Sequence, residues 1–490
     1  MALRARLAAP QEVRQDWPWH SAQIGTLPAS LLMSGDRRME ADNFLASGHG
    51  VKLAIEARLG RWDPLGSTAR VWQPSRLKGI QVGPEFGTPF LAASQVLDLR
   101  PVVRKWLSLD RTSTSADRFV ARGTILVTCS GNVGRSTLAQ AFHANRVLIS
   151  HDLLRVEARE AGHWGWLYSY LRGSKVRAMM SASQYGHMIK HLEVSHLLAL
   201  PIPVLTDTHR LQFEAPVAAL LTERDEALAL ITAAESRFER AVGQLPVGDA
   251  GEVGFTLPAA MLVGGRRRLE AAVHAPNIRT LRTHLKRGGR HSASIADLGC
   301  SVWMPTRFKR IEASDGVELV DSSDLFDVNP DPGRRIADGD FGDKYRGRVR
   351  PGWLLVARSG QAYGINGNVA IANNSYDGKV VTDDVIRIIP GPGIAAGYLY
   401  ICLSHPTLGR PLLKSVIYGS SIPHLDVADV LDVNIVRLPP DEEMAIADLA
   451  EAGARRLARA NDIENACGAA ADRVIDQLLA GEPLTAVPEV

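Results

Sequence analysis

The segment Gly123-Thr124-Ile125-Leu126-Val127, which runs on to Ser130-Gly131, occurs a second time as Gly352-Trp353-Leu354-Leu355-Val356, running on to Ser359-Gly360. In both places a glycine precedes a short apolar run and another glycine follows it, the pattern of a buried strand between two turns. The two segments lie roughly 230 residues apart, a separation that suggests a repeat of domain size.

The surrounding sequence repeats at nearly the same offset and in the same order. The matching blocks pair 27–41 with 257–271, 71–78 with 302–309, 87–101 with 316–330, 151–168 with 383–400, and 185–194 with 418–427. Each copy spans roughly 170 residues, which is too long for one unit of a solenoid and suits a duplicated domain. Short Val/Ile/Leu runs alternate with helical stretches inside each copy, so we expect a mixed, strand-rich α/β (α+β) fold.

A long helical stretch follows each copy. In 214–245, apolar residues recur at alternating spacings of three and four, interrupted by Arg224 and Glu235. The members of this first seam are Val217, Leu221, Leu228, Ile231, Phe238, Val242 and Leu245. A second seam in 442–479 runs through Ile446, Ala450, Leu457, Ala460, Cys467, Ala471, Val474 and Leu478. Either helix could pack on its own domain, but two matching seams favour packing of the helices on each other.

These patterns predict four parts in chain order. They are an N-terminal segment with the first copy (1–206), a central long helix (207–246), a linker with the second copy (247–438), and a C-terminal long helix with its tail (439–490). The formal net charge of +3 is too small for nucleic-acid binding by bulk charge, so any such contact needs local basic patches. The four cysteines are scattered singly, without zinc-type spacing, and no apolar run is long enough for a membrane span. We expect a reduced, cytoplasmic protein.

Several blocks resemble the target-recognition domains of type I restriction-modification specificity subunits. They are 123–134, 352–364, Arg307-Phe308-Lys309-Arg310 with the following Gly316-Val317-Glu318-Leu319, and Tyr418-Gly419-Ser420-Ser421-Ile422-Pro423-His424-Leu425. The order of domain, long helix, domain and long helix is similar to that family over nearly the whole chain. The resemblance implies a subunit without catalytic activity that binds a bipartite double-stranded DNA target for phage defence.

The resemblance also implies how the parts work together. The two helices would form an antiparallel coiled-coil spacer, and each domain would enter the major groove at one half of the target. DNA adenine methyltransferase subunits would dock on the assembly, and a restriction or translocase subunit could join them. S-adenosylmethionine, ATP and magnesium would bind those partners, and this chain would hold no cofactor and no metal.

Residues shared by both copies cannot distinguish two different half-sites, so we expect base contacts in the stretches that differ. Arginine suits guanine edges, and asparagine and glutamine suit adenine edges. The candidates for base contact are Arg118, Asn132, Arg135, Lys344, Arg346, Gln361, Asn366 and Asn368. The candidates for phosphate contact in the shared blocks are Arg76, Lys78, Arg307, Lys309 and Arg310, which could equally form a solvated charged face.

Motifs for chemistry are incomplete in this sequence. The stretch 130–137 resembles a phosphate loop but has Cys129 and Arg135 where that motif needs glycine and lysine, so a tight glycine turn is the better interpretation. Asn329-Pro330-Asp331-Pro332 lacks the aromatic residue of a methyl-transfer pocket. His191 and His424 occupy matching places and are expected to be framework residues. The alternatives that stay open are a self-sufficient nuclease or methyltransferase with an unrecognised site, and a scaffold that does not bind DNA.

Overall fold

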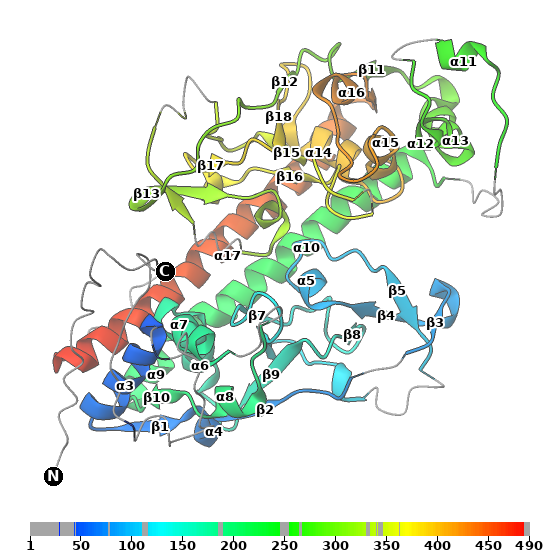
Figure 1. Cartoon of the computed structure of the whole chain (residues 1–490). Coiled ribbons are helices and arrows are strands. Elements are labelled where there is room, and N and C mark those ends of the chain that lie inside the picture. The colour runs from blue at the N-terminus through cyan, green and yellow to red at the C-terminus, as the bar shows by residue number, and fades with distance from the viewer. Residues whose placement is uncertain are drawn as a thin grey trace. The chain divides into compact units, whose positions relative to one another are not determined.

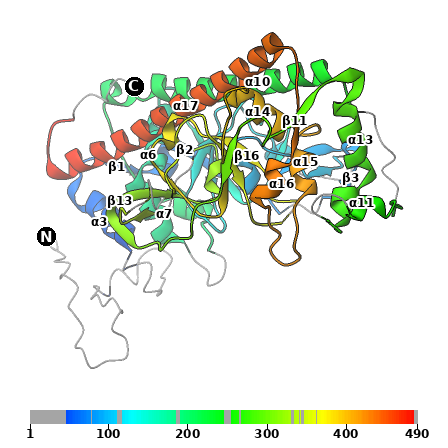
Figure 2. The ribbon, with the colours of Figure 1, turned by 90° about the horizontal axis from the view of Figure 1, so that it is seen from above.

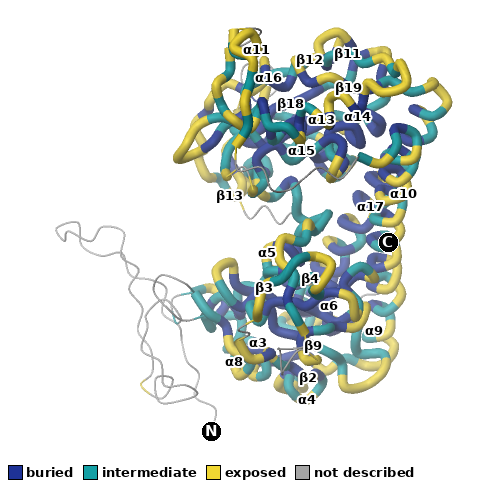
Figure 3. Tube along the Cα trace, turned by 90° about the vertical axis from the view of Figure 1, so that its right-hand side faces the viewer, coloured by how far each residue is buried: buried dark blue, intermediate teal, exposed yellow. Residues whose placement is uncertain are grey.

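The computed structural model describes Ala29, Phe44 and residues 46–76, 79–109, 116–184, 190–245, 254–263, 267–329, 334–339, 341, 346–361 and 363–484 (Figure 1). The described chain forms two compact units. Unit 1 comprises 1–96, 102–221 and 463–490, and unit 2 comprises 97–101 and 222–462. Buried residues, dark blue in Figure 3, lie in the interior of each unit. The units therefore differ from the four parts expected in chain order, because both take segments of the two long helices.

The described residues of unit 1 form three small sheets. Its four-stranded antiparallel sheet has the order β2 (Ala69–Trp72), β9 (Leu153–Ala158), β6 (Ile125–Thr128), β7 (Ser136–Leu138). A second sheet has the order β3 (Gln81–Val82), β5 (Lys105–Leu107), β4 (Thr88–Leu91), β8 (Leu148–Ile149), and β1 (Trp62–Pro64) pairs with β10 (Pro201–Pro203). The helices are α3 (Ser47–Arg58), α4 (Leu65–Thr68), α5 (Ala93–Val96), α6 (Trp164–Arg172), α7 (Ser174–Ser183), α8 (Val194–Leu198) and α9 (Asp207–Leu211), with 3-10 turns at Pro84–Phe86 and Ala116–Arg118.

Unit 2 repeats this arrangement. Its four-stranded antiparallel sheet has the order β12 (Ser301–Trp303), β18 (Val385–Ile389), β15 (Leu354–Ala357), β16 (Val369–Ile371). The other strands are β14 (Arg335–Ile336), β13 (Glu312–Val320) and β17 (Val380–Val381) in one sheet, and β11 (Ser292–Ser294) paired with β19 (Asn434–Val436). The helices are α11 (Ala260–Val263), α12 (Ala271–His274), α13 (Pro276–Leu285), α14 (Ala396–Ser404), α15 (Arg410–Ser415) and α16 (Val427–Leu431), with 3-10 turns at Arg287–Gly289, Asp324–Phe326 and Asn374–Tyr376.

The two copies agree in strand register as well as in strand order. Leu126 on β6 lies opposite Arg155 on β9, and the matching Leu355 on β15 lies opposite Arg387 on β18. Each copy also has one parallel strand pair, β4 with β8 and β13 with β17. Shared register requires shared inward and outward side-chain directions. The duplicated, mixed α/β fold expected from the sequence is therefore confirmed, although most of block 27–41 and residues 185–189 lie outside the described residues.

Two long helices follow the copies, α10 (Glu214–Val242) and α17 (Pro440–Ala480), green and red in Figure 2. Both begin and end within three residues of the stretches that the spacing predicts. All predicted members of the second seam are buried except Leu478, which is half-buried. In the first seam Leu228 and Leu245 are also only half-buried: Ala227 takes the inner position next to Leu228, and Leu245 lies beyond the end of α10. The helical prediction is confirmed, and Leu228 is corrected from a central to a marginal seam residue.

Within unit 2, the facing segments of the two helices run antiparallel. Glu223 of α10 lies 3.1 Å from Arg459 of α17, and Arg237, further along α10, forms two 2.7 Å hydrogen bonds with Glu442, near the start of α17. Between these pairs, Ile231 packs over Gly453 so closely that a β-carbon there would lie 2.8 Å from the Ile231 side chain. The core of unit 2 therefore takes residues from both helices.

Matching glycines let α6 and α14 approach the long helices. A β-carbon on Gly165 would lie 2.5 Å from the Phe213 carbonyl carbon, just before α10 in unit 1, and one on Gly397 would lie 2.4 Å from the Ala447 oxygen of α17 in unit 2. The Gly165 N–H donates to Glu214 at 2.8 Å, and the Gly397 N–H donates to Glu451 at 3.0 Å. Among the described residues, no helix is both long and apolar enough to cross a membrane.

Replacing Ile231 by aspartate should destabilise unit 2 by about 4 kcal/mol, because Ile231 is 2% exposed and the new carboxylate would be buried without a partner. Leu228→Asp is the matched control on the same helix and should cost about 1 kcal/mol or less, since its side chain reaches solvent. Urea denaturation monitored by circular dichroism measures both changes. Equal losses for the two variants would contradict the helix packing described here.

Unit 2 should also lose stability on acidification through His405. Burial, together with the neighbouring Arg100 guanidinium, lowers the pKa of His405 to about 4. Between pH 6.5 and pH 4 the unfolded chain takes up a proton that the folded chain excludes, so stability falls by up to about 3 kcal/mol as the pH drops. His405→Asn, which removes the titrating group, should flatten this part of the stability profile measured by thermal unfolding. An unchanged slope would show that His405 titrates normally in the fold.

Candidate nucleic-acid interface

A matched set of three polar residues holds the turn after the central strand in each copy. In unit 1 the Ser130 hydroxyl donates to Asp152 at 3.2 Å and lies 3.1 Å from His191 Nδ1. In unit 2 the Ser359 hydroxyl donates to Asp384 at 2.7 Å and lies 2.7 Å from His424 Nδ1. A catalytic serine needs the histidine between serine and carboxylate, whereas here the serine lies between the other two. The two histidines are therefore framework residues in the structure.

A buried arginine lies beside each of these sets. The Arg155 guanidinium donates to the carbonyl oxygens of Ile149 at 2.8 Å and Ser150 at 2.9 Å, and also to that of Leu153. The Arg387 guanidinium donates to the Thr382 carbonyl at 2.9 Å and to those of Val381 and Val385. Both side chains are fully buried, and burial lowers the pKa of Arg155 to about 10 and that of Arg387 to about 9. They are shared framework groups, unavailable to DNA.

The turns themselves are built on glycine. Gly131 and Gly134 have φ values of 73° and 83°, and Gly360 and Gly367 have φ values of 115° and 75°, a region that other residues rarely adopt. The glycine-turn interpretation of 130–137 is thereby confirmed. In the second copy the two glycines of the turn with positive φ are therefore Gly360 and Gly367, while Gly364 does not have positive φ.

Most of the predicted DNA-contacting residues reach the surface, and two do not. The exposed ones are Arg76, Asn132, Arg307, Lys309, Arg310, Arg346 and Gln361, while Arg135 and Asn368 are half-buried. Arg118 and Asn366 are fully buried. The Arg118 guanidinium donates to the Ser75 carbonyl, and the Asn366 amide donates to the carbonyls of Gly360 and Pro423 at 3.0 and 2.8 Å. These two are corrected from base contacts to framework residues; Lys78 and Lys344 lie outside the described residues.

The exposed candidates of unit 2 differ in how far their charges are neutralised. Arg310 forms a 2.9 Å ion pair with Asp383, and Arg307 lies 3.9 Å from the same carboxylate with its side chain 94% exposed. Arg346 stacks over the Trp303 ring at 4.5 Å. Lys309 is exposed, and none of the described acidic residues pairs with it. Lys309 and Arg307 therefore have the cationic groups best placed to meet a phosphate.

In unit 1 the structure adds a cation that the spacing did not reveal. Arg177 on α7 donates to the Asn132 side chain at 3.3 Å, and burial, together with the charges of Arg172 and Arg135, lowers the pKa of Arg177 to about 10. Arg177 thus joins Arg135 beside the glycine turn. No local signal marks Arg177, because it lies on a helix more than forty residues further along the chain. In unit 2 the matching cation is Lys414, which donates to the Gly364 and Asn366 carbonyls of the second turn at 3.0 and 2.8 Å. This match is visible only in the tertiary structure.

Comparisons with known proteins gave structural likenesses only. No family model matches this chain, and no curated protein matches it. The type I restriction-modification S subunit from M. genitalium is 13% identical, with 88% of this chain and 96% of that chain covered and a TM-score of 0.33. The HsdS subunit from Thermoanaerobacter tengcongensis is 14% identical, covering 86% and 97% at a TM-score of 0.25. The type IIG restriction endonuclease BpuSI is 13% identical, covering 37% and 31% at a TM-score of 0.27. At such values, function has to be inferred from this chain's own residues.

Replacing the buried Arg387 should destabilise the framework that positions the candidate interface of unit 2. Arg387→Met leaves several buried carbonyls without a donor and should cost about 3 kcal/mol of stability. Arg350→Met, an exposed arginine on the loop before β15, is the control and should change stability by less than about 0.5 kcal/mol. Chemical denaturation of both variants checks the difference. A neutral Arg387→Met would mean that the carbonyls find other donors.

Proposed function

We propose that this chain is the DNA-specificity subunit of a type I restriction-modification complex. The observation that carries the proposal is the duplication itself: two copies share their buried framework and differ in the polar residues around the same exposed turn. A protein that reads two unlike half-sites needs this combination, since a common frame can present different side chains to each half. The sequence blocks that resemble target-recognition domains support the same function.

The differing positions carry groups suited to DNA. Around the first turn the exposed or half-buried polar groups are Asn132 and Arg135, with Arg177 beside them, and around the second turn they are Gln361 and Asn368. Amides and guanidinium groups read base edges in the major groove. We propose that these residues contact bases and that Arg76, Arg307, Lys309 and Arg310 contact phosphates. The two copies would then read different DNA sequences with different side chains on the same main-chain framework.

The proposed function extends to the partners of the chain. The paired helices would serve as the spacer between the two reading domains, and DNA adenine methyltransferase subunits would dock on the assembly, joined by a restriction or translocase subunit. S-adenosylmethionine, ATP and magnesium would bind to those partner subunits. On this proposal the chain delivers partner enzymes to a bipartite target and performs no chemistry itself.

A self-sufficient DNA-modifying enzyme is the competing function. The hydrogen bonds of the described residues suggest two serine–histidine–carboxylate groupings, Asp152–Ser130–His191 and its counterpart, and their order does not activate the serine. Methyl incorporation or cleavage by the purified chain alone would favour the enzyme. Activity that appears only after partner subunits are added would favour the specificity subunit.

The decisive experiment exchanges one reading domain. Replacing 277–437 with the matching segment of a relative should change one half of the methylated target and leave the other half intact, because the two copies have separate frameworks. Methylation mapping of the reconstituted complex, before and after the exchange, measures this. A contiguous target, or one altered in both halves, would contradict the proposal.

Point variants separate base contacts from phosphate contacts. Gln361→Ala should relax one target position at a cost of about 1–3 kcal/mol in discrimination. Lys309→Ala should weaken all sequences alike and reduce the slope of log K against log salt by about 1. Binding titrations at several salt concentrations distinguish the two patterns.

A further inference from the structure

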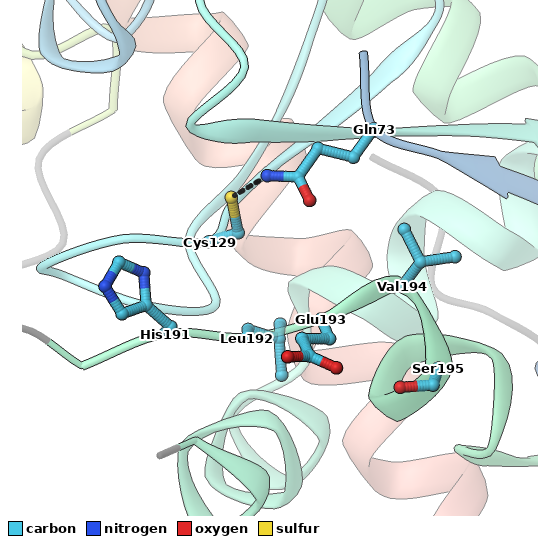
Figure 4. A pocket seen from close by; sticks show the side chains of 7 residues that line it. All are labelled: Gln73, Cys129, His191, Leu192, Glu193, Val194 and Ser195. Atoms are coloured by element: carbon cyan, nitrogen blue, oxygen red, sulfur yellow. Dashed lines mark hydrogen bonds between the residues drawn. The ribbon is translucent and has the colours of Figure 1, made fainter. Parts of the chain in front are cut away.

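Unit 1 contains a cavity beside Cys129, a residue whose counterpart in unit 2 is an arginine. The cavity has a volume of about 330 Å³ and lies between the ends of β2 and β6 and the start of α8 (Figure 4). Gln73, Cys129, His191 and Glu193 line it, together with the apolar Leu192 and Val194. This volume is at the lower end of the range for pockets that hold a small ligand or one side chain.

Backbone hydrogen bonds show that Cys129 and Arg358 occupy the same place in the two copies. The Cys129 N–H donates to the Asp152 carbonyl at 3.0 Å, and the Arg358 N–H donates to the Asp384 carbonyl at 3.2 Å. The Cys129 carbonyl accepts from Leu192 at 2.9 Å, as the Arg358 carbonyl does from Leu425 at 3.0 Å. The side chains can therefore be compared directly: unit 1 has a small thiol where unit 2 has a long cationic side chain.

In unit 2 that guanidinium has a defined partner. Arg358 lies 3.3 Å from Asp384, the carboxylate that also accepts from Ser359. The matching carboxylate in unit 1 is Asp152, which accepts from Ser130. Burial, together with the charge of Asp152, raises the pKa of the Cys129 thiol to about 11. Unit 1 has thus kept the carboxylate and lost the cation.

Two of the groups that line the cavity, Gln73 and Glu193, present acceptor oxygens. The Gln73 amide nitrogen donates to the His151 carbonyl at 2.7 Å and to the Cys129 sulfur at 3.3 Å, so its carbonyl oxygen is left to accept, and Figure 4 shows it turned to the side where Glu193 and Val194 lie. The exposed Glu193 carboxylate accepts a backbone N–H at the start of α8 and has a second oxygen to offer. Acceptors around an empty space suit a ligand rich in donors, and a guanidinium carries five N–H donors in one plane.

We propose that this cavity, here called the Cys129 pocket, binds the guanidinium group of an arginine side chain presented by another polypeptide. Gln73 and Glu193 are exposed, so the pocket opens at the surface and an arginine can enter while its main chain stays outside. Leu192 and Val194 would contact the aliphatic stem, and Gln73 and Glu193 would accept from the guanidinium. The inference does not depend on DNA binding.

The test uses the full chain with N-acetyl-L-arginine amide as the probe and N-acetyl-L-citrulline amide as its uncharged isostere. Saturation-transfer NMR should show saturable binding of the arginine probe at concentrations on the order of 1–10 mM and none of the citrulline probe. Cys129→Arg should abolish binding, because the introduced side chain would occupy the space beside the main chain of residue 129. Cys129→Ser, which keeps the space, should retain binding, and Glu193→Gln should weaken it about two- to fivefold.

The reciprocal variant tests the same idea in unit 2. Arg358→Cys should lower the melting temperature, and the arginine probe, but not the citrulline probe, should restore part of the loss. Absence of saturable binding to the unaltered chain, equal binding of citrulline, or binding that persists in Cys129→Arg would overturn the proposal. Agmatine binding tenfold tighter than the capped arginine would overturn the assignment to a polypeptide side chain in favour of a free guanidinium compound.

Discussion

The guanidinium of Arg155 lies in the interior of unit 1 and donates to three backbone carbonyls, and the rest of the candidate interface depends on it. A buried charge without such partners would cost many kcal/mol, so the segment 149–153 has to turn its carbonyls inward. That turn places Asp152 beside the end of β6, where it accepts from Ser130, which in turn meets His191. The exposed glycine turn is positioned through this series of contacts. Arg387, Asp384, Ser359 and His424 repeat it in unit 2.

The long helices impose the second constraint, because each unit is completed by segments of both. In unit 1, Tyr168 and Arg172 of α6 contact Glu464 of α17, and Gly165 lies against the start of α10. In unit 2, Gly397 of α14 lies against α17, while Phe238 of α10 packs edge-on against Tyr398 with ring centroids 6.1 Å apart. Neither copy buries its helical face with its own chain segment alone. The helices are therefore part of both cores rather than appendages to them.

Divergence of the two copies is concentrated where the framework meets solvent. Arg155 and Arg387 are kept, since replacing either would expose carbonyls to an apolar interior. A few residues away, Cys129 stands where the other copy has Arg358, and the main-chain hydrogen bonds around both are the same. Because buried hydrogen bonds fix the backbone, side chains at its surface can be exchanged without changing the main-chain arrangement. Different ligands can thus be accommodated at equivalent places of one fold.

The sequence by itself determined the duplication, the positions of the strands and the extents of the two long helices. These features follow from local periodicity and from order along the chain: the seam from Val217 to Val242 and the glycines flanking each central strand are visible without any contact being known. It also indicated that His191 and His424 belong to the framework, because they stand in a repeated block.

Only the tertiary structure decided which polar groups are buried and which are free. Arg118 and Asn366 look as suitable for base edges as Arg346 and Gln361, yet the carbonyls of Ser75, Gly360 and Pro423 engage the first two inside the fold. Arg177 joins the turn from a distant helix, and the Cys129 pocket exists because a carboxylate and an amide from separate segments surround a side chain that is too small. The physical reason is that hydrogen-bond partners far apart in sequence are chosen by packing, and no local pattern records that choice.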